Sequence, residues 1–94
     1  MESGNRNQIE FDPAKSAKNV ALRGLPFSLA AGFDFDRALI VVDDRREYGE
    51  IRYRAIGMMS GKVAVLVFTM RGKILRVISL RYANKKERFM YESR

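Results

Sequence analysis

The feature that most constrains the fold is a run of strand-forming segments in the second half of the chain, separated by tight turns. These segments are rich in apolar and β-branched residues, which favour strands. Ser60-Gly61 and Arg71-Gly72 interrupt them where a hairpin turn needs glycine, and Gly57 is interpreted as a further turn or bulge glycine. Such short connections predict an antiparallel meander. The expected strands are residues 38–42, 51–59, 62–70 and 74–80.

Helical signals precede this run. Asp12-Pro13 begins the first predicted helix, because aspartate caps free amides and proline suits the first helical position. Gly24 ends it. A second short helix is expected over residues 27–33. The residues that predict a narrow apolar stripe along the first helix are Ala14, Ala17, Val20 and Ala21.

The chain is expected to close with another helix, because Asn84 and Glu87 have the spacing of a capping box. Together these elements predict an α+β fold with two N-terminal helices, an antiparallel sheet of about four strands and a C-terminal helix. We expect the helices to pack on one sheet face and leave the other free to bind a ligand. Residues 1–8 are expected to form a flexible N-terminus, and residues 9–94 a single domain that opens with a short extended segment at 9–11.

Missing residue types exclude several classes of function. The 94 residues contain no cysteine and no histidine. Disulfides, thiolate or imidazole metal sites and histidine-dependent nucleophilic catalysis are therefore excluded, and we expect neither a metal nor a cofactor. No apolar stretch approaches the roughly 18–20 residues of a membrane span, and the first residues lack a secretory signal. The expectation is a cytoplasmic protein with no membrane partner.

Positive charge is concentrated near the C-terminal end. The net charge is +7, and residues 71–94 hold eight of the 18 Lys and Arg but only two of the 11 Asp and Glu. A localised excess of this kind predicts a polyanion-binding surface, with RNA as the expected ligand. A solvated helix face, or a surface that docks an acidic protein, is the alternative. The residues of this segment that we expect to bind RNA are Arg71, Lys73, Lys85 and Lys86.

Strand alternation singles out several arginines. It places Arg52 and Arg54 on the same face of their strand, and Arg76 on the face opposite Ser79 in the last strand. Arg81 follows where that strand gives way to the final helix. An arginine among apolar strand residues needs a carboxylate partner or an open surface, since burying an unpaired guanidinium is costly. The candidate partners are Glu50 and Glu87.

RNA cleavage is chemically accessible without histidine. Arginines hold the scissile phosphate and neutralise the charge that develops during attack by a 2′-hydroxyl. A carboxylate such as Glu87, or a tyrosine or lysine with a shifted pKa, moves protons. The structural alternatives are that Glu87 serves only the capping box, that Tyr91 is a packing residue and that Lys15 is a solvated charge.

Several stretches resemble the BrnT toxin family, over about residues 9–92. Residues 9–15 are similar to its opening, although Phe11 stands where tryptophan is usual. Residues 49–57, which read Gly-Glu-Ile-Arg-Tyr followed by Ile56-Gly57, are similar to its Gly-Glu-x-Arg and Ile-Gly segment. The most specific stretch is 76–83, and it continues to Glu87, Arg88 and Tyr91.

The resemblance implies a RelE-like ribonuclease fold, RNA cleavage that halts translation, and neutralisation by a BrnA-type antitoxin. Such antitoxins are ribbon-helix-helix proteins, and the complex typically represses its own operon, so operator DNA is contacted only through the antitoxin complex. The candidate active-site residues carried over by position are Arg52, Arg76, Arg81, Glu87, Arg88, Tyr91 and Lys15.

Two positions depart from the family pattern. Leu22-Arg23-Gly24 stands where Lys-His-Gly is common, and Phe68 stands where some members have histidine. These departures motivate two alternatives to an active enzyme. One is a catalytically decayed toxin that binds its antitoxin and tunes operator repression, and the other is a non-catalytic RNA-binding domain.

Overall fold

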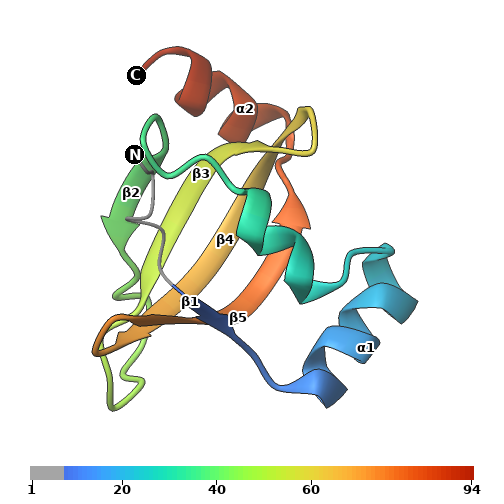
Figure 1. The fold of residues 1–94 in the computed structure, drawn as a ribbon. Coiled ribbons are helices and arrows are strands. Elements are labelled where there is room, and N and C mark those ends of the chain that lie inside the picture. The colour runs from blue at the N-terminus through green and yellow to red at the C-terminus, as the bar shows by residue number, and fades with distance from the viewer. Residues whose placement is uncertain (1–7) are drawn as a thin grey trace, which may run out of the picture.

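A five-stranded mixed sheet, with helices packed against it, organises the chain. The computed structural model describes residues 8–94, and the strand order across the sheet is β1-β5-β4-β3-β2 (Figure 1). The α+β class predicted from the sequence is confirmed. The elements in chain order are β1 (Gln8–Glu10), α1 (Pro13–Arg23), the 3-10 helix η1 (Phe27–Gly32), β2 (Leu39–Val42), β3 (Tyr53–Met59), β4 (Lys62–Arg71), β5 (Ile74–Tyr82) and α2 (Lys85–Glu92).

The predicted meander is confirmed, but the sheet is not purely antiparallel. Strands β2 to β5 pair in sequence order and antiparallel, whereas β1 pairs in parallel with β5. The pattern missed β1 as a sheet strand because three residues carry too little periodicity, and because its partner lies more than 60 residues away in the chain. The flexible N-terminus expected over residues 1–8 lies outside the described residues, except for Gln8, which belongs to β1.

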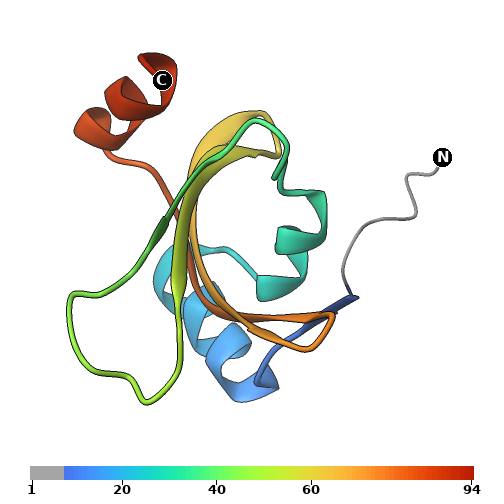
Figure 2. The ribbon, with the colours of Figure 1, turned by 90° about the vertical axis from the view of Figure 1, so that its left-hand side faces the viewer.

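The helices lie on both faces of the sheet, so the expectation of one covered and one free face is wrong. In Figure 2, α1 and η1 lie on one side of the curved sheet, and α2 lies on the other together with the loop that joins β2 to β3. The larger hydrophobic cluster, which includes Phe27, Leu66 and Leu80, fills the η1 side. A smaller cluster of Ile56, Val65 and Tyr91 lies beneath α2. The second face is therefore covered at one end by α2.

Polar side chains, not the predicted apolar stripe, hold α1 in place. Ala14, Ala17 and Ala21 are exposed and Val20 is 44% exposed, while the buried residues of α1 are Ser16 and Asn19. The Asn19 side-chain amide donates to the carbonyls of Leu25 and Leu80 at 2.8 and 2.9 Å. The Ser16 hydroxyl accepts from the Phe27 amide. These bonds satisfy backbone groups where α1 meets the chain after it and the end of β5.

A bulge in the last hairpin changes which residues of β5 share a face. Val67 pairs with Ser79, but the next residue, Phe68, pairs with Val77, so one residue of β5 is left over. A bulge of this kind reverses the alternation beyond it. Ser79 consequently lies on the same face as Arg76, which corrects the assignment from strict alternation. Arg76 and Arg81 are five residues apart and would lie on opposite faces of a regular strand, but the bulge places them on the same face.

Gly57 lies within β3 and not at a turn. A Cβ atom at this position would come within 3.0 Å of Phe33 and Ala38 side-chain atoms and 3.2 Å of the Asp34 carbonyl oxygen. The residue is small because the chain leading from η1 to β2 crosses β3 there. Gly72 has a φ of 63° in the β4–β5 turn, which confirms the prediction that it is a turn glycine.

Replacing Asn19 with alanine is expected to destabilise the protein by about 2 kcal/mol, because it removes two buried hydrogen bonds and leaves two carbonyls without a donor. The free energy of unfolding from urea titration followed by circular dichroism measures this. Lys18→Ala, on the exposed side of α1, is the matched control and should change the value by less than about 0.5 kcal/mol. Equal effects of the two substitutions would contradict this account of how α1 is held.

Candidate nucleic-acid interface

Arg54 of β3 and Arg76 and Arg81 of β5 project from the sheet face opposite η1, and Arg52 lies two residues before Arg54, where strand alternation places it on the same side. Arg54 pairs with Val67, and Val67 pairs with Ser79; in the adjacent row Val65 pairs with Arg81. The bulge in β5 brings Arg76 to the same side. We call this surface the arginine face, and its defining residues are Arg52, Arg54, Arg76 and Arg81.

Three of the four arginines each contact a carboxylate. Arg52 Nε lies 3.3 Å from Glu50 Oε2, and Arg76 Nη1 lies 3.1 Å from Glu10 Oε2. Arg81 makes a two-pronged contact with Glu87, with both nitrogen–oxygen distances at 2.7 Å. Glu50 and Glu87 were the candidate partners predicted from the sequence, and both form ion pairs with these arginines. Glu10 was missed because it comes from β1, whose parallel pairing with β5 places it beside Arg76.

The Arg81–Glu87 pair joins the sheet to α2. The capping box is confirmed: the Asn84 amide donates to Glu87 Oε1 at 2.9 Å, and the Glu87 amide donates to Asn84 Oδ1 at 2.8 Å. The Glu87 side chain is 13% exposed. The Arg81 guanidinium, by its hydrogen bonds, lowers the pKa of Glu87 to about 2, with help from the Asn84 amide. A carboxylate with such a low pKa is a weak proton acceptor at neutral pH.

Arg54 is the residue of this face that the sequence analysis did not select. Its Nε is buried, and among the described residues it is the one buried side-chain nitrogen or oxygen without a hydrogen-bond partner. The charge of Arg54 is a minor contribution to the lowered pKa of Glu87. Alternation already placed Arg54 beside Arg52, and the signal that could have found it was a second arginine on one face of a short, otherwise apolar strand.

The loop between β2 and β3 borders the arginine face on the side away from α2. Asp43, whose side chain is 2% exposed, accepts from Arg45 at 2.7 and 2.9 Å and from the Tyr48 hydroxyl at 3.3 Å. The hydrogen bonds from Arg45 lower the pKa of Asp43 to about 2. This buried, ionised carboxylate organises a loop that the sequence does not otherwise define.

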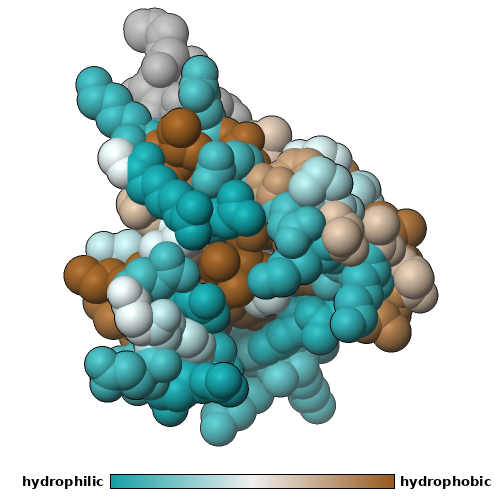
Figure 3. Space-filling view, turned by 90° about the horizontal axis from the view of Figure 1, so that it is seen from below, coloured by the Kyte–Doolittle hydropathy of each residue, from teal (hydrophilic) through white to brown (hydrophobic). Residues whose placement is uncertain are grey.

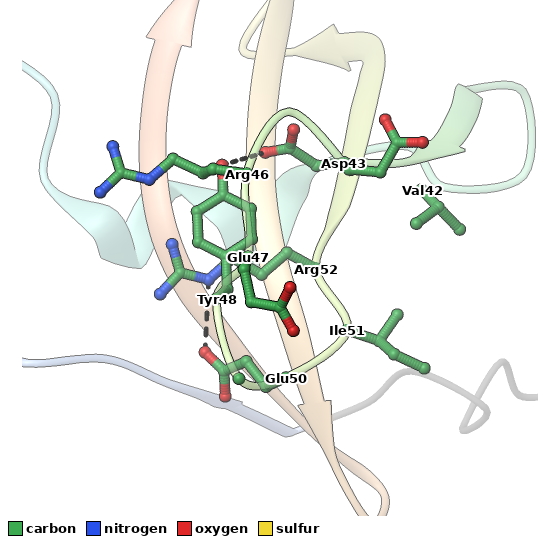
Figure 4. Close-up of a pocket in the computed structure, with 10 residues that line it drawn as sticks. Val42, Asp43, Arg46, Glu47, Tyr48, Glu50, Ile51 and Arg52 are labelled. Carbon is green, nitrogen blue, oxygen red and sulfur yellow. Dashed lines mark hydrogen bonds and ion pairs between the residues drawn. The ribbon is translucent and has the colours of Figure 1, made fainter.

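The same loop forms a hollow of roughly 650 Å³ around Tyr48. Figure 4 shows the side chains of Arg46 and Arg52 projecting to the same side, near the Tyr48 ring, whereas Val42 and Ile51 point away from it. The guanidinium carbons of Arg52 and Arg46 lie 4.1 and 5.8 Å from the Tyr48 ring centroid. From below, this end of the molecule is covered largely by hydrophilic residues (Figure 3). An aromatic ring bordered by guanidinium groups suits a nucleobase and its phosphate.

The remaining candidate residues lie at several places. Lys85 and Lys86 are exposed in the first turn of α2, and Arg71 and Lys73 are exposed around the β4–β5 turn. Arg88 donates to the Ala83 carbonyl at 3.1 Å. Lys85, Lys86 and Arg88 lie on α2 at one end of the arginine face, whereas Arg71 and Lys73 lie around the β4–β5 turn, with Arg71 Nη2 3.9 Å from Glu50 Oε1.

Two other candidate residues are not exposed beside the arginines of that face: one is buried beneath α2 on the same side of the sheet, and one lies on α1. Tyr91 is 8% exposed and packs in the hydrophobic cluster beneath α2, with the Arg94 guanidinium 3.8 Å from its ring centroid. Lys15 is exposed on α1, which lies on the other side of the sheet from α2 (Figure 2). The structure therefore brings together the arginines and Glu87 but separates them from Lys15.

Comparison with known proteins identifies the family. A family model described as the ribonuclease toxin BrnT of the type II toxin-antitoxin system matches residues 11–87. The chain belongs to the BrnT toxin family. The matched region spans α1 to the first turn of α2 and includes all four residues of the arginine face. No curated protein matches the chain.

Residues 8–94 of this BrnT chain offer neither a metal-binding cluster nor a membrane-spanning helix. Within that range there is no group of three or more Asp, Glu, His or Cys residues arranged to hold a metal ion. The helices in the same range all fall short of the length and apolarity required to cross a bilayer.

Acid is expected to weaken the fold through Glu87. Because its pKa is lowered on folding to about 2, its contribution to stability is present above its unfolded pKa of about 4.3 and is lost as pH falls from there toward 2. Glu87→Gln should lower the free energy of unfolding by roughly 2–3 kcal/mol at pH 7, and the difference from the parent should vanish near pH 2. Urea titrations from pH 7 to pH 2 measure it. Glu47→Gln, at an exposed loop carboxylate, is the control, and a pH-independent effect at Glu87 would contradict the assignment.

Proposed function

We propose that this chain is a metal-independent endoribonuclease with a RelE-like fold that halts translation in the cytoplasm and binds RNA across the arginine face. The observation that carries the proposal is the gathering of four guanidinium groups on one sheet face, between α2 and the β2–β3 loop, in a member of a ribonuclease toxin family. Guanidinium groups bind phosphate oxygens in pairs and retain their charge at any physiological pH, which suits a polyanionic substrate.

In the proposed reaction the 2′-hydroxyl oxygen attacks the adjacent phosphorus, and the bond to the 5′-oxygen breaks. A 2′,3′-cyclic phosphate and a free 5′-hydroxyl result, with the 2′ proton passing to water and the leaving oxygen protonated by water. Arg81 and Arg52 neutralise the additional negative charge on the phosphorane. Electrostatic stabilisation of this kind is often the largest single contribution to catalysis.

Glu87 is a positioning residue in this proposal. Its low pKa and its two contacts with Arg81 suit it to orient a guanidinium and do not suit it to accept a proton. Tyr91 is assigned to packing because it is buried beneath α2. Arg76 belongs to the arginine face and Arg88 borders it, and Tyr48 supplies a ring for base stacking. The lysines and arginine that guide the RNA strand along the edge are Arg71, Lys73, Lys85 and Lys86.

A type II system pairs the toxin with a protein antitoxin. We propose a BrnA-type ribbon-helix-helix antitoxin that covers the arginine face with acidic side chains, so that neutralisation and RNA binding compete for the same surface. Operator DNA is then contacted through the antitoxin within the complex. The net charge of +7 supports an acidic partner.

A second candidate function is a non-catalytic module that binds the antitoxin and adjusts operator repression. The observation that favours it is the pairing of Arg52, Arg76 and Arg81 with carboxylates in the free protein. It predicts antitoxin binding without RNA cleavage.

Induced expression of the chain in cells distinguishes the endoribonuclease from the non-catalytic antitoxin-binding module. The parent chain should arrest growth and fragment cellular RNA, and Arg81→Gln should lower the cleavage rate by roughly 100-fold, because it removes one transition-state contact. Arg37→Gln, exposed and outside the interface, is the matched control and should retain activity. Normal growth and intact RNA with the folded parent chain would refute the enzyme and leave the module.

A further inference from the structure

We infer that Arg54 and Arg81 form a clamp for one RNA backbone phosphate, and that the Glu87 carboxylate occupies this clamp until RNA displaces it. This inference rests on the proposed function. It adds that Glu87 contacts Arg81 in the free protein and is replaced there by phosphate in the RNA complex.

Arg54 carries the inference because the fold gives it no other role. Leaving a polar group buried and unpaired destabilises a protein, and a charged group more so than a neutral one. Arg54 Nε is in that state, and no hydrogen bond or ion pair is made by the Arg54 side chain within residues 8–94. A leucine or methionine at this strand position would avoid the cost. Unpaired groups of this kind cluster where a ligand completes the pairing.

The register places Arg54 and Arg81 on either side of β4. Arg54 faces Val67 on β4, and Arg81 faces Val65, two residues away along the same strand. Strand spacing of about 4.8 Å and a rise of about 3.4 Å per residue put their Cα atoms about 12 Å apart. Two extended arginine side chains can span this distance and hold one tetrahedral anion between them, above the apolar surface of β4.

Glu87 enters this space from the first turn of α2. Both of its oxygens contact Arg81, and its pKa responds to the charge of Arg54 as well as to that of Arg81. A carboxylate and a phosphate diester present the same pair of acceptor oxygens to a guanidinium. The carboxylate therefore occupies one half of a site whose other half, Arg54, remains without a contact.

Displacement of Glu87 need not unfold α2. Glu87 Oε1 also accepts from the Asn84 amide, and that bond belongs to the capping box. If the side chain turns away from Arg81 while keeping this bond, the helix start is preserved and two guanidinium groups become available to a phosphate.

The first test is binding of a single-stranded RNA oligonucleotide with 2′-O-methyl riboses, which cannot be cleaved by 2′-hydroxyl attack. Fluorescence anisotropy between 50 and 200 mM salt gives the Kd and its salt slope. Arg54→Gln should raise the Kd about tenfold and reduce the slope by roughly 0.7, as expected for one lost phosphate contact to a single strand. Arg23→Gln, an exposed arginine on α1 across the sheet, removes the same charge and should change the Kd less than twofold.

These outcomes separate the clamp from the proposed function. If the parent chain binds the oligonucleotide and Arg54→Gln behaves like Arg23→Gln, the clamp is wrong and the proposed function stands. If the folded parent chain neither binds the oligonucleotide nor cleaves unmodified RNA, the proposed function fails and the clamp fails with it.

A second test addresses occupation by Glu87. Glu87→Gln keeps a residue type that suits the capping box but removes the competing charge, so it should lower the Kd for RNA several-fold. The Kd is measured at 10 °C, on a sample that circular dichroism has first shown to be folded at that temperature. Arg54→Met should raise the urea midpoint of unfolding while weakening RNA binding. An unchanged or raised Kd for Glu87→Gln, or a lowered midpoint for Arg54→Met, would overturn the inference, because either result would mean that Arg54 and Glu87 act mainly to stabilise the fold.

Discussion

The contact between Arg81 at the end of β5 and Glu87 in the first turn of α2 is the interaction on which the rest of this structure depends. It holds the start of the last helix against the sheet face opposite η1, and it completes the capping box that begins this helix. It also keeps Glu87 ionised, since the pKa of that carboxyl is lowered to about 2. The same pairing commits both oxygens of Glu87 to Arg81 and leaves Arg54 without a hydrogen-bonded partner. One contact thus sets the position of a helix, the ionisation of a carboxylate and the availability of a guanidinium.

In this domain the arginines of the arginine face and their carboxylate partners affect both the stability of the fold and the proposed binding of a ligand. The larger apolar cluster lies on the η1 side, where the helices cover it. The opposite face carries the arginines, and its own apolar cluster is limited to the part beneath α2. A domain of 94 residues has a modest core, so a buried guanidinium nitrogen without a hydrogen-bond partner, such as Arg54 Nε, is a noticeable cost in stability. That this chain retains one on the face matched to a ribonuclease toxin family supports the view that the surface is maintained for a ligand.

Most of the fold could be predicted from the sequence because its signals are local. Turn glycines and β-branched runs marked the meander, Asp12-Pro13 marked α1, and the Asn84–Glu87 spacing marked α2. The missed elements depend on distant partners. Strand β1 is defined by β5, and the docking of α1 by Asn19 depends on carbonyls of Leu25 and Leu80. The apolar stripe predicted along α1 is exposed, because polar side chains on another side of the helix hold it against the rest of the domain.

Local chemistry by itself determined which residue types this protein offers: arginines in strands, a basic C-terminal quarter and no histidine. It also determined the order of the elements, because hydrogen-bond capping and β-propensity act over a few residues. Only the tertiary structure decided that the arginines share a face. The bulge opposite Val67 reverses the alternation in β5, and the packing of α2 brings Glu87 to Arg81 but not to Arg54. Both outcomes depend on the pairing of strands and the packing of a helix on the sheet, which cannot be predicted from the residue pattern of a single strand.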